Sequence, residues 1–178
     1  MPYRSTEFWK IQQDLEKINT MLMKEQSYGI IPLYKTSDKT YEVLIIQQAK
    51  EQYWGFPKGH VEKIDIQKSH PQNPLESIQE TGVACAKREM KEEVDLDVVV
   101  LPSPTFTDTY IYFIDNQKRD KTVVYYIGFV QSQKVTLLEK ELSDYQWLSF
   151  SEAMEKLTHD GAKNLLHQVE NYLYENPD

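Results

Sequence analysis

The sequence contains almost no cysteine. Cys85 is the only one among 178 residues, so the chain has no internal disulfide framework. A lone cysteine fits a reducing compartment, and we expect a cytoplasmic protein. Leu, Ile, Val and Phe make up about a quarter of the chain, above the ~20% below which chains tend to be disordered. A chain of this length buries enough surface to fold without a disulfide or metal staple.

Long apolar runs are also absent. The longest are Val43–Ile46 and Val98–Leu101, far short of the ~18–20 residues that cross a bilayer. We therefore expect no membrane span and no membrane partner. The first residues have no apolar core ahead of a small-residue cleavage site, so we also expect no signal peptide.

Positive charge is the third scarcity. Lys and Arg total 20 against 28 Asp and Glu, a net charge of −8. Binding to nucleic acid by counterion release needs a basic surface, so the composition argues against long nucleic acids and leaves RNA 5′ ends as an exception. The excess carboxylates are either solvated and scattered, or gathered at one site.

The predicted elements follow the order helix, strands, one helix, strands, helices. Apolar spacings of three and four predict helices over residues 5–25, 80–94, 152–157 and 162–174, the third with Ser151 as its N-cap. Alternating or β-rich segments predict strands over 28–34, 41–48, 97–101, 105–114, 122–131 and 145–150, with a hairpin loop over 115–120. Residues 62–79 contain two prolines and no sustained periodicity, which predicts a loop. The order predicts one domain over residues 1–178 of the α/β (α+β) class, with a mixed sheet and the central helix packed on it.

The carboxylates gather in the run Arg88-Glu89-Met90-Lys91-Glu92-Glu93. On a helix, the three glutamates share one face, where like charges repel. Such a face gains stability when a cation lies among the carboxylates, and oxygen ligands suit Mg²⁺ or Mn²⁺. Taken alone, the run also fits a solvated helix face. The strand-turn Trp54-Gly55-Phe56-Pro57-Lys58-Gly59-His60-Val61-Glu62 lies upstream, and its glycines allow close backbone approach.

Together the two segments resemble the signature of the Nudix hydrolases, G-x5-E-x7-R-E-U-x-E-E-x-G-U with U aliphatic. Gly59 matches the first glycine and Glu80 the first glutamate, and the remaining matches are Arg88, Glu89, Met90, Glu92, Glu93 and Leu96. The resemblance implies an α/β/α sandwich with the acidic helix on the sheet. Gly59 and Glu80 lie 15 positions further apart than in the signature, which indicates an insertion. Asp65 is the alternative first acid, since it follows Gly59 at the signature spacing but breaks the spacing to Arg88.

Asp95 replaces the last glycine of the signature. That glycine ends the helix in a left-handed conformation, which Asp tolerates better than most residues. We therefore expect the helix to end normally at this position.

A narrower resemblance covers most of residues 28–150. The Trp54–Glu62 segment, the strand Lys121-Thr122-Val123-Val124-Tyr125-Tyr126 and the run from Glu141 to Leu148 are similar to asymmetrical diadenosine tetraphosphate hydrolases. Tyr112 stands where that subgroup has a tyrosine before the K-T-V strand. This resemblance implies water attack on phosphorus, which yields ATP and AMP. Other Nudix substrates (RNA 5′ ends, nucleoside triphosphates, ADP-ribose, diphosphoinositol phosphates) and a non-catalytic nucleotide-binding module are the alternatives.

The resemblance also implies roles for individual residues. Metal ligands would be the Gly59 carbonyl and the carboxylates of Glu89, Glu92, Glu93 and Glu141. The catalytic set would be Glu80, Arg88, Glu92, Glu93 and Glu141, with the general base left open. Contacts to phosphate or base would come from Lys58, His60, Tyr112, Lys121 and Tyr145. Cys85 has no partner base in any motif, which indicates a structural residue.

Overall fold

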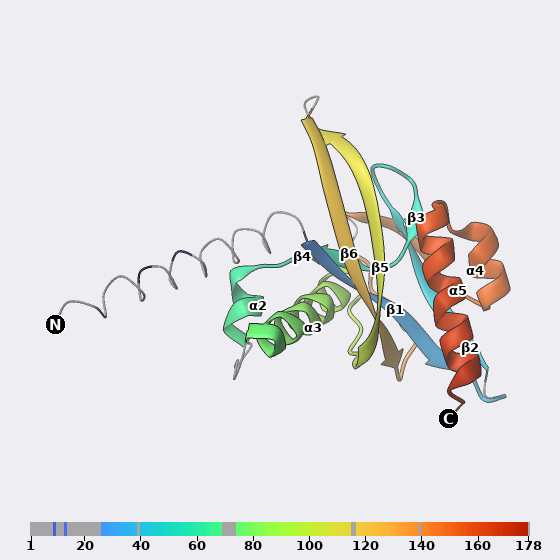
Figure 1. Ribbon diagram of the computed structural model, residues 1–178. Helices are drawn as coiled ribbons and strands as arrows, with labels where there is room; N and C mark the ends of the chain where they lie inside the picture. Colours follow the sequence, from blue (N-terminus) through green and yellow to red (C-terminus); the bar gives the residue numbers. More distant parts are fainter. Residues whose placement is uncertain are drawn as a thin grey trace.

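A seven-stranded mixed sheet forms the centre of the protein (Figure 1). The structure is a computed structural model that describes residues 9, 13, 26–38, 40–68, 74–114, 117–138 and 140–177. The main path of the sheet runs β3-β2-β1-β6-β5, with β4 paired to β1 and β7 paired to β2. β1 and β6 are parallel, whereas the other pairs are antiparallel. The strands are β1 Gln26–Lys35, β2 Tyr41–Gln48, β3 Trp54–Gly55, β4 Lys58–His60, β5 Val99–Ile114, β6 Gln117–Val130 and β7 Leu142–Leu148.

Helices cover both faces of this sheet, and each face has its own apolar core. The helices are α2 Lys63–Lys68, α3 Pro74–Val94, α4 Phe150–Lys156 and α5 Asp160–Glu175. On one face, Cys85, Ala86 and Met90 of α3 pack against the sheet. On the other face, Leu165 and Leu166 of α5 pack with Ala153 of α4. The predicted α+β sandwich is therefore confirmed, and the acidic helix α3 forms one of its outer layers.

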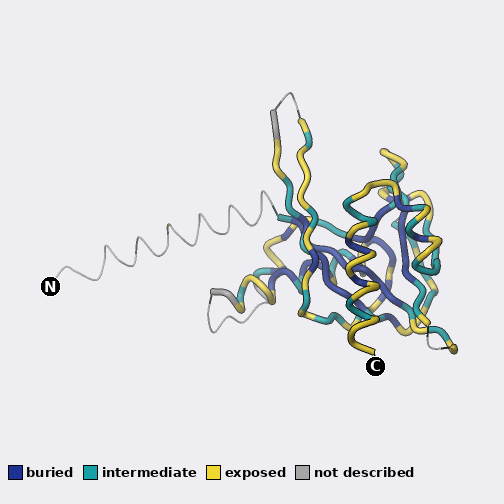
Figure 2. Tube along the Cα trace, turned by 45° about the vertical axis from the view of Figure 1, so that its right-hand side comes forward, coloured by how far each residue is buried: buried dark blue, intermediate teal, exposed yellow. Residues whose placement is uncertain are grey.

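The strands β5 and β6 continue beyond the body of the sheet as a two-stranded arm. β1 pairs with β6 only from Thr122 onward, whereas the β5–β6 ladder continues to the pair Ile114 and Gln117. The arm projects from the body in Figure 1, and most of its described tip is exposed in Figure 2. The base of the arm lies near β4, so that Asp108 and Tyr110 of β5 line the same cavity as Lys58 of β4.

Several boundaries differ from the sequence prediction. The loop predicted over 62–79 is wrong over residues 63–68 and 74–79, which are helical. Pro74 does not break α3 but begins it, since the first helical residue needs no backbone donor. The loop predicted over 115–120 is wrong from residue 117, where β6 begins, and the two strands predicted over 97–114 form one strand with an irregular register between Leu101 and Thr105.

The predicted N-cap of α4 is also wrong by two residues. Ser149 caps the helix and forms a capping box with Glu152. The helix predicted over 5–25 lies outside the described residues, except for Trp9 and Gln13, which are helical. Within the described part of the chain, no helix combines the length and hydropathy that crossing a bilayer requires.

Candidate active site

Gly59 brings β4 into contact with the acidic face of α3. A Cβ atom placed on Gly59 would lie 2.0 Å from the Cδ and Oε1 atoms of Glu89, so any side chain here would displace that carboxylate. The Gly59 carbonyl accepts a hydrogen bond from the Cys85 thiol at 3.6 Å. Burial raises the pKa of Cys85, and an un-ionised buried thiol of this kind is structural. The absence of a side chain at residue 59 therefore positions Glu89 directly against the backbone.

Arg88 joins the helix to the loop that follows β4. Its Nη2 donates to the His60 carbonyl at 2.8 Å and to Asp65 Oδ2 at 3.0 Å, and its Nε donates to Asp65 Oδ1 at 3.1 Å. Its Nη1 lies 2.8 Å from Glu89 Oε1 and 2.8 Å from Glu92 Oε2. Burial alone would lower the pKa of Arg88, but the hydrogen bonds that Arg88 donates to Asp65 and the charges of Glu89 and Asp65 raise it. Arg88 thus fixes two of the helix carboxylates at once.

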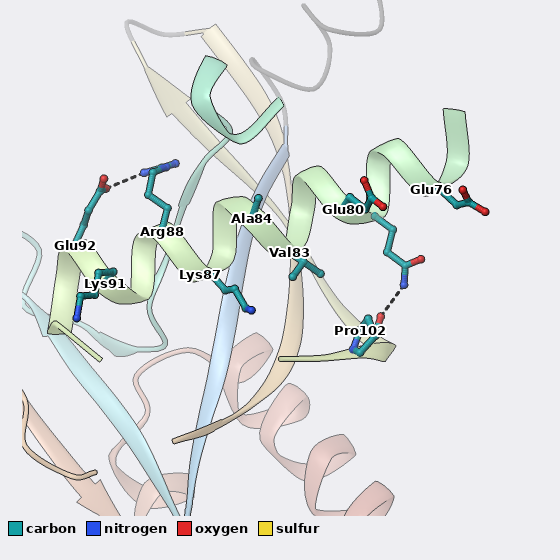
Figure 3. Close-up of a pocket in the computed structure, with 10 residues that line it drawn as sticks. Glu76, Glu80, Val83, Ala84, Lys87, Arg88, Lys91, Glu92 and Pro102 are labelled. Atoms are coloured by element: carbon teal, nitrogen blue, oxygen red, sulfur yellow. Dashed lines mark hydrogen bonds and ion pairs between the residues drawn. The ribbon is translucent and has the colours of Figure 1, made fainter. Parts of the chain in front are cut away.

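The acid that pairs with Arg88 is Asp65 rather than Glu80. The Asp65 side chain is fully buried, and it also accepts a hydrogen bond from the Glu62 backbone N–H at 2.8 Å. Glu80 lies two turns earlier on α3 than Arg88 and is exposed. Figure 3 shows Glu80 well separated from Arg88 and Glu92 along the helix. The geometry therefore favours the register in which Gly59-x5-Asp65 begins the motif and the insertion follows Asp65.

Glu93 is the most buried carboxylate of the acidic face. It is 4% exposed, and its Oε2 accepts a hydrogen bond from the Lys58 backbone N–H at 3.1 Å. Burial, together with the charges of Glu89 and Glu141, raises the pKa of Glu93 to about 8 against the opposing charge of Lys58. Burial likewise raises the pKa of Glu89, with contributions from Glu92 and Glu141. Four carboxylates therefore lie close enough to disfavour one another's charge.

This donor set fits a hard divalent cation, although the carboxylates do not yet converge on one point. Among the described residues, no three acidic, histidine or cysteine side chains are grouped closely enough to form a metal site. The Arg88 guanidinium pairs with Glu89 and Glu92, and the Lys58 backbone N–H binds Glu93. Mg²⁺ needs only one or two carboxylates because it keeps several waters. The mutual repulsion around Glu89 and Glu93 is the feature that a cation would relieve. The residues that would hold it are Glu89, Glu92, Glu93, the Gly59 carbonyl and Glu141, which lies in the turn just before β7.

Three basic side chains lie on the opposite face of the sheet from Glu89. A Cβ atom on Gly29 would meet Lys58 Cβ and Tyr125 Cε1, so these two side chains share the face to which Gly29 points. Strand alternation places His60 on the same face as Lys58, and Lys121 on the same face as Tyr125. Lys58 and His60 therefore reach one side of β4, whereas Gly59 between them faces the acidic helix.

The charges of these groups depend on one another. Burial lowers the pKa of Lys121 to about 8, and the nearby charge of Lys58 contributes. Burial, Lys121 and Lys58 lower the pKa of His60. Burial also opposes the charge of Lys58, but Tyr53, Tyr110 and Glu93 outweigh it and raise its pKa. A concentrated positive patch of this kind attracts phosphate oxygens.

A cavity of about 560 Å³ opens beside Lys58, between the root of the arm and the start of α5. Tyr53, Tyr110 and His159 line it together with Asp108 and Gly161. The rings of Tyr53 and His159 lie 5.3 Å apart, and those of Tyr110 and Tyr112 lie 6.2 Å apart. The cavity therefore combines aromatic walls with a cationic end, the composition of a nucleotide pocket.

The two tyrosines predicted to bind base lie in different places. Tyr112 is on the arm, opposite Arg119 and against the Tyr110 ring, so Tyr110 rather than Tyr112 reaches the cavity wall. Tyr145 pairs with Ile46 and packs on the α3-side core. Its surroundings are those of a core residue.

The end of α3 follows the sequence prediction. Asp95 has a φ of 55°, the left-handed conformation that the signature glycine provides in this position. Its backbone N–H donates to the Lys91 carbonyl at 3.1 Å, and its Oδ1 pairs with Lys91 Nζ at 2.8 Å. The aspartate thus ends the helix without disturbing the carboxylates before it.

Comparisons with known proteins find one matching family profile and several similar structures. The profile of the NUDIX domain matches residues 23–169. The structure is similar to that of an Ap4A hydrolase from C. elegans in a binary complex, with a TM-score of 0.65 and 20% identity over 85% of this chain and 98% of that chain. It is also similar to a NUDIX hydrolase structure from Listeria monocytogenes (TM-score 0.59, 21% identity, 86% of this chain, 97% of that chain). No curated protein sequence matches the chain significantly.

A further similar structure is the NUDIX domain of Shewanella oneidensis NrtR complexed with ADP ribose, with a TM-score of 0.57 and 14% identity over 84% of this chain and 88% of that chain. Such identities show a shared fold. The profile match and the acidic helix together identify a hydrolase of phosphoric anhydrides. The chain belongs to the Nudix hydrolase family, since the profile match spans most of its length.

Proposed function

We propose that the protein is a divalent-metal-dependent pyrophosphohydrolase that cleaves dinucleoside polyphosphates, with diadenosine tetraphosphate giving ATP and AMP. The observation that carries this proposal is the division of charge across β4. Glu89 contacts Gly59 on one face, whereas Lys58 and His60 project from the other. A polyphosphate needs both, a cation-binding group at the cleaved anhydride and basic side chains for the remaining phosphates.

Most acidic residues of this site would act as metal ligands in the proposed mechanism. A bound Mg²⁺ or Mn²⁺ would lower the pKa of a water molecule and offset charge on the attacked phosphoryl group. Glu89, Glu92, Glu93, Glu141 and the Gly59 carbonyl would hold the ion. Arg88 orients Glu89 and Glu92, and Asp65 fixes Arg88 in turn. The general base would be one of the glutamates of this site.

The remaining substrate would extend from this centre past Lys58 into the aromatic cavity. Lys58, His60 and Lys121 would contact the phosphates that are not attacked. Tyr110 lines the cavity, where it would stack on a base. The Tyr112 ring lies against the Tyr110 ring and would support it. A long polyanion bearing an aromatic group at each end uses more of this surface than a nucleoside triphosphate does.

Product analysis tests the proposal. The protein is incubated with Mg²⁺ in separate reactions that contain equal concentrations of diadenosine tetraphosphate, ATP, ADP-ribose, a 5′-triphosphorylated RNA or a diphosphoinositol phosphate, and the products of each are separated by chromatography. We expect the dinucleotide to be consumed first and to give ATP and AMP in equal amounts. Two molecules of ADP, or faster turnover of another substrate, would contradict the substrate assignment. Tight nucleotide binding without turnover in Mg²⁺ or Mn²⁺ would identify a binding module instead.

A further inference from the structure

One carboxylate in the aromatic cavity is not used by the proposed hydrolysis. Asp108 belongs to β5 and lines the cavity together with Lys58 and Tyr110. Its carboxylate lies against the start of α5, since a Cβ atom placed on Gly161 would be 2.5 Å from Asp108 Oδ1 and 2.6 Å from Oδ2. Glycine at residue 161 thus makes room for a carboxylate that comes from a strand 53 positions earlier in the chain.

The carboxylate determines which part of a nucleotide can occupy this end of the cavity. The start of a helix normally attracts phosphate, and His159 provides no side-chain hydrogen bond to cap α5. With Asp108 already at this position, a phosphate group would be repelled. The cavity therefore accepts an uncharged hydrogen-bond donor beside Asp108 and an anion beside Lys58.

The lining of the cavity carries both signs of charge. Lys58, Tyr110 and Asp108 all line it, so an anion can bind beside the cation and a hydrogen-bond donor beside the carboxylate. In a nucleotide the sugar follows the phosphate directly, and the base follows the sugar. The rings of Tyr53 and His159, which also line the cavity, lie 5.3 Å apart.

We propose that Asp108 accepts hydrogen bonds from the 2′- and 3′-hydroxyl groups of a substrate ribose and so selects ribonucleotides over deoxyribonucleotides. A carboxylate offers two acceptor oxygens and no donor, which matches two neighbouring hydroxyl donors. This inference rests on the proposed function, because it assumes that a nucleotide binds with its phosphates at Lys58. Asp108 is a specificity residue and takes no part in the chemical step.

The test compares diadenosine tetraphosphate with its analogue that lacks both 2′-hydroxyl groups. Removing one hydrogen bond to a charged group should lower kcat/KM roughly tenfold or more in the wild type. Asp108→Asn should abolish most of this discrimination, because one acceptor becomes a donor. Asn has nearly the same size as Asp, so its side chain fits the same space beside Gly161. Asp97→Asn removes an exposed carboxylate elsewhere and should leave the discrimination unchanged.

Gly161→Ala provides an independent variant that leaves the carboxylate in the chain. The added methyl would displace the Asp108 carboxylate, and alanine is the better helix residue. We therefore expect the variant to remain folded in thermal melts and to lose discrimination against the deoxy analogue. Equal rates for both substrates in the wild type, or discrimination that survives Asp108→Asn, would overturn the proposal. So would a change in adenine-against-guanine preference in Asp108→Asn without any change in ribose preference.

Binding of mononucleotides separates this proposal from the proposed function. Isothermal titration calorimetry with AMP and 2′-deoxyAMP needs no turnover. If no dinucleotide is hydrolysed but AMP binds roughly tenfold more tightly than 2′-deoxyAMP in the wild type only, the hydrolysis assignment fails and the role of Asp108 stands. If neither binds, or both bind equally well, the role of Asp108 is refuted.

Discussion

The pair formed by Asp65 and Arg88 gives the sharpest prediction. The Asp65 side chain is fully buried and that of Arg88 is only 9% exposed. Breaking a buried ion pair typically costs ~3–5 kcal/mol. Arg88 keeps its contacts with Glu89 and Glu92, so we expect the lower end, about 3 kcal/mol, for Asp65→Ala. Asp65→Asn keeps the shape of the side chain but removes its charge, and it should lower the free energy of unfolding by about 1.5–3 kcal/mol.

The same substitutions should reduce activity, because Arg88 orients two carboxylates of the acidic face. A displacement of about 1 Å at a reacting centre can lower a rate ~100-fold, so kcat of Asp65→Asn should fall by at least about tenfold. Urea unfolding gives the stability, and steady-state hydrolysis of diadenosine tetraphosphate gives kcat.

The matched control is Glu80→Gln, which removes the acid of the other register. Glu80 is exposed, and exposed substitutions usually change stability by less than about 0.5 kcal/mol. We therefore expect near wild-type stability and kcat. A Glu80 variant that loses more activity than Asp65→Asn, or an Asp65→Asn variant as stable as the wild type, would refute the assignment of Asp65 as the first acid.

Three further predictions concern the acidic face and the strand beside it. Gly59→Ala should nearly abolish activity and weaken Mg²⁺ binding measured by calorimetry, because its Cβ would fall 2.0 Å from the Glu89 carboxylate; normal activity would show that Glu89 moves freely. The pKa of Glu93 is raised to about 8 in the folded protein, above the ordinary ~4.3 of an unfolded chain. The folded state therefore binds more protons between these two values. The metal-free protein should lose stability as pH rises from about 5 to about 7. Glu93→Gln should flatten that loss in urea titrations, and an unchanged slope would contradict it. Ser27 has a buried hydroxyl with no hydrogen-bond partner among the residues that the structure describes, so Ser27→Ala should leave the free energy of unfolding unchanged or raise it. A loss above about 1 kcal/mol would reveal a partner.

The sequence predicted the features that depend on local spacing. The acidic face of α3 follows from helical periodicity, and the left-handed end at Asp95 follows from the residues that tolerate positive φ. The close contact of Gly59 with Glu89 joins two segments that the signature already relates. These features need no knowledge of distant contacts.

The features that the sequence left open depend on contacts between distant segments. The insertion can follow either Gly59 or Asp65, and only the buried pair with Arg88 selects between them. Residues 74–79 were predicted as loop because prolines usually end helices, whereas Pro74 begins one. The cavity residues Tyr53, Asp108 and His159 come from three separated segments and follow no motif. Among the site residues that the sequence left open, Asp65 was the one marked by a motif, because its spacing from Gly59 fits the signature.

The most direct measurement of the central claim is the fate of diadenosine tetraphosphate in ¹⁸O-labelled water, with Mg²⁺ and with a chelator. Products are identified by chromatography and mass spectrometry. The account predicts ATP and AMP in equal amounts, one ¹⁸O atom in only one product of each cleavage event, and no products when the chelator is present or when Glu92 and Glu93 are replaced by Gln. Two molecules of ADP, or cleavage that continues at the same rate in the chelator, would contradict it.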